Sequence, residues 1–187
     1  MQTLTHERYF NAQTYDNFRQ QAGKHEGLWN GVYEHLKVPD DAIARLKELP
    51  GRRHVLVLAE DWCGDAASLV PIVAKLADAA PEMVEVRVLA RDENLDIMDR
   101  YLSHGGRSIP VAIVYDEDMR ELGWWGPRPA PAQAMFREKT RGFRAGKLTD
   151  KNVDVYRPLL RWYREDRGRH TIDEILIILE RGGAARS

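Results

Sequence analysis

The middle of the chain alternates short apolar runs with stretches of helical periodicity. After His54, an unbroken apolar run over residues 55–58 has the length and the β-branched composition of a strand that is buried on both faces. From residue 63 onward, apolar residues recur at three- and four-residue spacing, and Pro81 separates this predicted helix from a second strand over 84–89. The pattern therefore predicts a β-α-β unit with a parallel sheet at its centre.

The same alternation continues further along the chain. Asn94 is placed to cap a short helix, and a glycine pair at 105–106 separates that helix from a strand over 111–115. The acidic turn at 116–118 predicts a hairpin whose second strand runs over 122–125. These elements give the order β-α-β-α-β-β, and a helix is expected to follow.

Helical patterns also flank this central unit. The first fifty residues read as helices, with Pro39 ending one of them and Asp40 placed to cap the next. Thr171 and Glu174 have the spacing of a capping box at the start of the last helix. After the hairpin, helices are expected over 130–141, 153–164 and 171–181.

These patterns indicate an α/β protein with a central mixed β-sheet flanked by helices. We divide the chain into an N-terminal helical extension over 1–50 and one compact unit over 51–187, which holds the sheet and the C-terminal helices. A chain of 187 residues is long enough for one domain of ordinary size with such an extension.

The composition restricts the partners of this protein. Its 28 Lys and Arg residues are balanced by 29 Asp and Glu residues, so the charge gives no reason to expect nucleic acid as a partner. No apolar run approaches the roughly 20 residues that a membrane span requires, and the amino terminus lacks the pattern of a secretory signal. We therefore expect a cytoplasmic protein that associates with neither nucleic acid nor membrane.

The single cysteine, Cys63, lies where the first predicted strand turns into its helix. With one cysteine no intramolecular disulfide can form, so any redox chemistry must recruit a second thiol. Free N–H groups at a helix start stabilise a thiolate and lower the cysteine pKa, whereas the carboxylates of Glu60, Asp61 and Asp65 raise that pKa. The two effects are of similar size, and from the sequence either direction of the shift stays open.

The residues around Cys63 resemble the active-site motif of the thioredoxin superfamily. Thioredoxins carry Trp-Cys-Gly-Pro-Cys after the first core strand, and this chain has Trp62-Cys63-Gly64-Asp65-Ala66 there. Pro71 stands where the family has a proline in the active-site helix, and Ser108-Ile109-Pro110 matches the family's Thr-Ile-Pro, whose proline is cis and faces the thiol. Gly126 falls where the family has a groove glycine. The resemblance implies a thioredoxin-like fold with helical extensions at both ends and an exposed thiol.

Two departures from the thioredoxin pattern bear on function. Ala66 replaces the second cysteine of the motif, and Val57 replaces the buried aspartate that accepts a proton in thioredoxins. Without a second thiol, a mixed disulfide on Cys63 has no intramolecular route of release, so an ordinary dithiol reductase is not expected. The site looks like that of a bacterial branch of the family with a monothiol WCGDA motif.

The resemblance therefore implies a monothiol oxidoreductase. Its catalytic Cys63 would attack a protein or small-molecule disulfide, and an external low-molecular-weight thiol would resolve the adduct. For Asp65 two roles stay open: stabilisation of the helix start, and proton transfer to or from the sulfur. The substrate-binding residues that the resemblance implies are Trp62, Gly64, Ser108, Ile109, Pro110 and Gly126.

Two other functions compete with this hypothesis. A redox-inactive binding module would keep the groove without the reductase chemistry. A glutathione-assisted iron–sulfur carrier ranks last, because the Cys-Gly-Phe-Ser motif usual in such carriers is absent. The six histidines show no close metal-ligand pairing, so neither a protein-only metal site nor a cofactor is expected.

Overall fold

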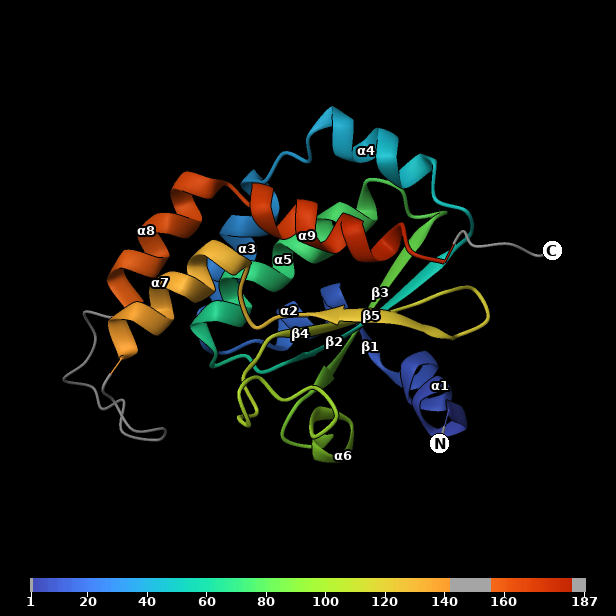
Figure 1. Cartoon of the computed structure of the whole chain (residues 1–187), viewed down its shortest axis with the longest axis horizontal. Helices are drawn as coiled ribbons and strands as arrows, with labels where there is room; N and C mark the ends of the chain where they lie inside the picture. The colour runs from blue at the N-terminus through green and yellow to red at the C-terminus, as the bar shows by residue number, and fades with distance from the viewer. Residues whose placement is uncertain (1, 142–155, 183–187) are drawn as a thin grey trace.

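A five-stranded mixed sheet forms the centre of the molecule (Figure 1). The computed structural model describes residues 2–141 and 156–182. The strand order is β1-β3-β2-β4-β5; β2 and β3 are parallel, and the other neighbouring pairs are antiparallel. The strands are β1 (Gln13–Thr14), β2 (Arg53–Ala59), β3 (Val84–Ala90), β4 (Val111–Tyr115) and β5 (Glu121–Trp125).

Helices cover both faces of this sheet. In Figure 1, α5 and α9 lie on one side, and α1 and α6 lie on the other. The helices are α1 (Gln2–Asn11), α2 (Tyr15–Gln21), α3 (Glu26–His35), α4 (Asp40–Lys47), α5 (Gly64–Asp78), α6 (Leu95–Met98), α7 (Ala130–Thr140), α8 (Tyr156–Asp166) and α9 (Arg169–Leu179). The α/β architecture with helices at both ends is therefore as predicted. None of the described helices combines the length and the apolar character that a membrane span needs.

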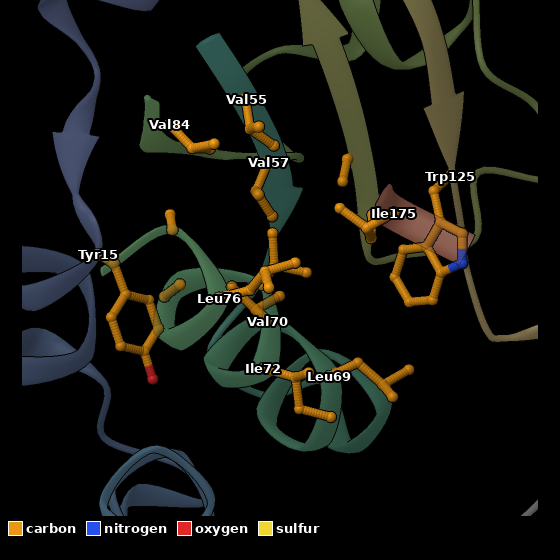
Figure 2. Close-up of a cluster of buried hydrophobic side chains, with 14 of the residues drawn as sticks. Tyr15, Val55, Val57, Leu69, Val70, Ile72, Leu76, Val84, Trp125 and Ile175 are labelled. Atoms are coloured by element: carbon orange, nitrogen blue, oxygen red, sulfur yellow. The ribbon is translucent and has the colours of Figure 1, made fainter. Parts of the chain in front are cut away.

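The central strand β2 explains why the hydrophobic pattern was informative. All seven of its residues are buried, and the last five, residues 55–59, form the unbroken apolar run that marks the strand in the sequence. Val55 and Val57 belong to the cluster that Leu76 of α5 also joins (Figure 2). Leu56 and Leu58 belong to a second cluster on the opposite face. Packing on both faces thus fixes the position of β2, and the loop to α5 begins at its carboxyl end.

The N-terminal segment is not helical throughout. Within the first fifty residues, which the sequence pattern predicts to be helical, the short strand β1 separates α1 from α2. This strand pairs with β3 and so adds an edge strand to the central sheet. Two residues are too few for a period of two to be visible in the sequence. The division of the chain at residue 50 stays a prediction.

The capping box predicted at Thr171 and Glu174 is wrong. Helix α9 begins at Arg169 after Gly168, two residues before the predicted start at Thr171. Glu174 does not cap this helix: its two carboxylate oxygens accept hydrogen bonds from Trp125 Nε1 and the Ala130 N–H. A partner distant in the sequence has replaced the local one that the capping-box spacing indicates.

The remaining helix ends differ from prediction by small amounts. Asp40 is the first residue of α4 and does not cap it with its side chain. Asn94 is the N-cap residue of α6, but its side-chain amide donates to the Ala90 carbonyl instead of accepting from the helix. The helix predicted over 153–164 begins at Tyr156 in the described part of the chain, and residues 153–155 lie outside it.

The contact between Gly126 and Pro110 gives the first testable prediction. Gly126 has a φ of +130°, and a Cβ there would lie closer to the Pro110 carbonyl oxygen than real Cβ contacts allow. We expect Gly126→Ala to lower the free energy of unfolding by about 2–4 kcal/mol, because it adds backbone strain and a clash with backbone. Urea denaturation would measure the loss.

The matched control for this substitution is Gly31→Ala. No atom lies within 4 Å of a Cβ at this position inside α3, so the added methyl group meets open space. Alanine there should raise the free energy of unfolding by about 0.5–1 kcal/mol, since it is the better helix former. Equal unfolding midpoints for the two variants would contradict the close approach at Gly126.

Candidate functional site

Cys63 lies at the start of α5, directly after the loop that follows β2. It is the N-cap residue of the helix, with extended backbone angles, and its sulfur accepts a hydrogen bond from the Ala66 N–H at 3.5 Å. The thiol in turn donates to the Ile109 carbonyl oxygen at 3.6 Å. The sulfur therefore stands between the first turn of a helix and the backbone that leads into β4.

Pro110, which follows Ile109, is buried and preceded by a cis peptide bond, the geometry that the resemblance implies. Gly126, at the end of β5, packs its backbone against the Pro110 carbonyl, where no side chain fits. Gly126 thus lets β5 and β4 approach closely beside the thiol.

A cleft of about 710 Å³ opens beside Cys63. Five of the predicted site residues line it: Trp62, Cys63, Asp65, Ser108 and Ile109. The other three, Gly64, Pro110 and Gly126, do not. The cleft is completed by residues that the sequence did not single out, among them Arg91, Arg107, Arg128, Phe136, Arg137 and Tyr156.

The thiol of Cys63 has a raised pKa. Its burial is the largest cause, because a charged thiolate is disfavoured away from water, and the Asp65 carboxylate raises the pKa further. The backbone N–H groups of Ala66 and Asp65 and the guanidinium of Arg128 act in the opposite direction. The sequence left the direction of the Cys63 pKa shift open. In the structure, burial raises the pKa by more than the helix N-terminus lowers it.

Asp65 belongs to a buried polar network. Its Oδ2 accepts a hydrogen bond from Nη2 of Arg128, and its Oδ1 accepts from the Tyr163 hydroxyl at 2.7 Å. The side chains of the ion pair are only 7% and 8% exposed. The negative charge on Asp65 is therefore compensated by Arg128 at the place where α5 begins.

Arg128 is itself held from several directions. Nη1 donates to Gln133 of α7 at 3.1 Å, and the guanidinium stacks on the Phe136 ring, 3.8 Å from its centroid. The network joins α5, the segment after β5, α7 and α8. Burial and the neighbouring Asp65 carboxylate strongly raise the pKa of Tyr163, so its hydroxyl stays a hydrogen-bond donor.

Sequence reasoning missed Arg128 and Tyr163 for a physical reason. They are 63 and 98 residues away from Asp65 along the chain, and no local spacing connects them. The one available signal for Arg128 was its position just after Gly126, in the segment that leaves the last strand.

The N-terminal extension fixes the loop before Cys63. Oδ2 of Asp61 accepts hydrogen bonds from the N–H groups of Gly23 and Lys24, and the Asp61 carbonyl accepts from Trp29 Nε1. Because this loop is held by the extension, the position of the thiol depends on residues that precede β2 in the sequence.

Trp62 forms the open side of the site. The side chain is 44% exposed, and Arg91 lies over its ring, 5.2 Å from the centroid. Its carbonyl oxygen lies 3.2 Å from Nε2 of His25. The described residues contain no group of three or more His, Cys, Asp or Glu side chains that could hold a metal ion.

Comparisons with known proteins bear on the family and the fold. A family model described as thioredoxin matches residues 12–141. A protein of unknown function from Pseudomonas aeruginosa has a similar structure, with a TM-score of 0.70 and 21% identity over 93% of this chain and 94% of that one. An HIV epitope scaffold gives a TM-score of 0.68 and 22% identity over 96% and 98% of the respective chains. No curated protein matches the sequence.

At these identities the solved structures establish the fold, and the family model establishes the relationship. Its matched region contains the whole sheet, Cys63 at the start of α5, and Pro110 next to Gly126. The fold is thioredoxin-like, with helical extensions at both ends. With 130 of its 187 residues inside the matched region, this chain belongs to the thioredoxin family.

Proposed function

We propose that the protein carries out thiol–disulfide exchange through Cys63 as a monothiol. The observation that carries this proposal is the place of the sulfur, at the N-cap of α5 and on the wall of an open cleft. In the first step, the Cys63 thiolate attacks one sulfur of a disulfide, forms a mixed disulfide and releases the other sulfur as a thiolate.

Release of this adduct requires a second molecule. Cys63 is the single cysteine of the chain, and Ala66, at the position of the second cysteine in thioredoxins, is fully buried. An external low-molecular-weight thiol, as its thiolate, then attacks the mixed disulfide and restores Cys63. In this step the external thiol leaves as a mixed disulfide with one half of the substrate. A second external thiolate attacks its external sulfur and releases that half as a thiolate. In sum, two external thiols become one disulfide while the substrate disulfide is reduced to two thiols, so electrons and protons balance.

The raised pKa of Cys63 slows this chemistry without abolishing it. A higher pKa lowers the fraction of thiolate, but each thiolate is then a stronger nucleophile. With a Brønsted coefficient of about 0.4–0.5, one unit of increase costs about three- to fourfold in rate near neutral pH instead of tenfold. A redox-inactive binding module is the second candidate function, and the same raised pKa favours it.

For Asp65 the contacts favour an electrostatic role over direct proton transfer. Both carboxylate oxygens already accept hydrogen bonds, from Arg128 and Tyr163. The hydrogen bonds of the Cys63 sulfur in the described part of the chain are with Ala66 and Ile109, and not with the Asp65 carboxylate. In this proposal Asp65 is a positioning residue: it anchors the first turn of α5 and, with Arg128, sets the charge beside the thiol.

The pH dependence of alkylation tests the state of the thiol. We expect the rate of iodoacetamide reaction with Cys63 to rise about tenfold per pH unit from neutral pH and to level off only above the usual range of a cysteine. Burial is the reason, because it keeps the proton on sulfur. Mass spectrometry of samples quenched between pH 6 and pH 10 would give the profile. A plateau already reached at neutral pH would contradict the raised pKa.

Asp65→Asn separates the two roles of the carboxylate. Removing this charge should lower the pKa of Cys63 and speed its alkylation at a fixed neutral pH, because the Asp65 carboxylate raises that pKa. The variant should also lose about 3–5 kcal/mol of stability, since Arg128 is left buried without its partner. Tyr163→Phe keeps both charges and should cost about 1.5–3 kcal/mol.

The disulfide-exchange rate of these variants completes the test. An electrostatic role predicts that Asp65→Asn exchanges at least as fast as wild type at neutral pH. A loss of exchange in a folded Asp65→Asn protein with faster alkylation would instead assign proton transfer to this carboxylate.

Ala66→Cys tests whether the cleft supports exchange. The introduced thiol would lie three residues from Cys63 on the first turn of α5, where a disulfide between the two can form. We expect this variant to reduce insulin with less dependence on added glutathione, because the second sulfur releases the mixed disulfide. If the internal disulfide forms and reduction is no faster than in wild type, the binding-module function replaces exchange.

A further inference from the structure

We propose that the cleft beside Cys63 selects disulfides that carry negative charge, and that Arg137 is the residue that makes this selection. The inference rests on the proposed exchange function and adds to it the class of substrate. The supporting observation is the distribution of charged side chains between the wall of the cleft and the surface outside it.

Four arginines line the cleft: Arg91, Arg107, Arg128 and Arg137. They come from the segment after β3, the loop before β4, the segment after β5, and α7. Among the described residues of the lining, Asp65 is the one carboxylate, and its charge is compensated by Arg128. The wall that faces a ligand is therefore cationic, although the whole chain has a net charge of −1.

The carboxylates that pair with two of these arginines lie outside the lining. Arg91 pairs with Asp92 at 2.7 Å, and Arg107 pairs with Asp99 at 2.6 Å. Neither aspartate lines the cleft, so both pairs present their guanidinium side to it. The Asp99 pair is about half-exposed, and exposed pairs of this kind contribute little, so a ligand carboxylate can compete for Arg107.

Arg137 differs from the other three arginines. Within the described ranges no ion pair joins it to a carboxylate, and its hydrogen-bonding neighbour is the His104 ring, which belongs to the loop before β4 and also lines the cleft. The side chain is exposed, so a ligand carboxylate can reach it without competing with an internal carboxylate.

The uncharged lining suits the same class of ligand. Ser103, Ser108, Gln133 and Thr140 supply hydroxyl and amide groups that can donate hydrogen bonds to carboxylate oxygens. Trp62, Phe136 and Tyr156 supply apolar surface for the carbon chain between sulfur and carboxylate. The lining can therefore contact both the carboxylate and the carbon chain of a small acidic thiol or disulfide.

Three symmetrical disulfides of similar length test the proposal: 3,3′-dithiodipropionate, 2-hydroxyethyl disulfide and cystamine, which are anionic, neutral and cationic. Each would react with Cys63 at low ionic strength, and mass spectrometry would follow the mixed disulfide. In each reaction the Cys63 thiolate forms the new S–S bond, and one half of the reagent leaves as a thiolate. We expect the anionic reagent to react fastest and the cationic one slowest.

Arg137→Gln should reduce this preference. In water, one unit charge about 7 Å away changes the local concentration of a singly charged group about threefold. Because the anionic and cationic reagents are affected in opposite directions, the ratio of their rates should fall by up to about tenfold. In wild type, 0.5 M salt should reduce the same ratio, because it screens exposed charges.

Arg120→Gln is the matched control, with the same loss of charge. Arg120 lies in the β4–β5 hairpin, pairs with the exposed Asp118 and does not line the cleft. Its variant should keep the wild-type ratio. The proposal is overturned if cystamine reacts as fast as dithiodipropionate in wild type, or if Arg137→Gln and Arg120→Gln give the same ratio.

A second pair of reagents separates this proposal from the exchange function. Iodoacetate and iodoacetamide alkylate a thiol without disulfide chemistry and differ in charge. If no disulfide reacts but Arg137→Gln lowers the iodoacetate to iodoacetamide rate ratio, the exchange function fails and the selection for negative charge stands. The opposite outcome is that the disulfides react, but Arg137→Gln changes neither the anionic-to-cationic disulfide rate ratio nor the iodoacetate-to-iodoacetamide rate ratio. In that case the exchange function stands and the selection fails.

Discussion

The buried ion pair between Asp65 and Arg128 is the interaction on which the site depends. Together with the Tyr163 hydroxyl, it ties the first turn of α5 to the segment after β5 and to α8. Breaking such a pair by removing one partner costs about 3–5 kcal/mol, a large fraction of the stability of a domain. The ion pair also compensates the carboxylate of Asp65 on the cleft wall. The same contact therefore holds the C-terminal part of the chain in place and sets the charge beside Cys63.

A second set of contacts holds the opposite side of the site. Asp61 is bound by the N–H groups of residues 23 and 24, and Trp29 donates to its carbonyl. Residues from both ends of the chain thus contact the loop after β2 and the first turn of α5, on either side of Cys63 in the sequence. This position, and not the sheet alone, explains how a cysteine becomes partly buried and still lines a cleft.

The chemistry follows from that partial burial. A helix N-terminus favours a thiolate, but desolvation outweighs it here and keeps the proton on sulfur. In a thioredoxin-family protein with one cysteine, this combination suits slow exchange that depends on an external thiol. In the proposed selection, Arg91, Arg107 and Arg137 discriminate among such thiols and disulfides by charge. The carboxylate partners of Arg91 and Arg107 stand outside the lining, and within the described residues no ion pair joins Arg137 to a carboxylate.

The sequence by itself determined the strands β2 to β5, the place of Cys63 and the family. These features are local: the buried strand β2 is continuously apolar over residues 55–59, and the thioredoxin-like motif lies in five consecutive residues. The tertiary structure decided the strand β1, the partner of Glu174, the partners of Asp65 and the direction of the Cys63 pKa shift. Each of these depends on groups that are distant in the sequence and on burial, which a linear pattern does not contain.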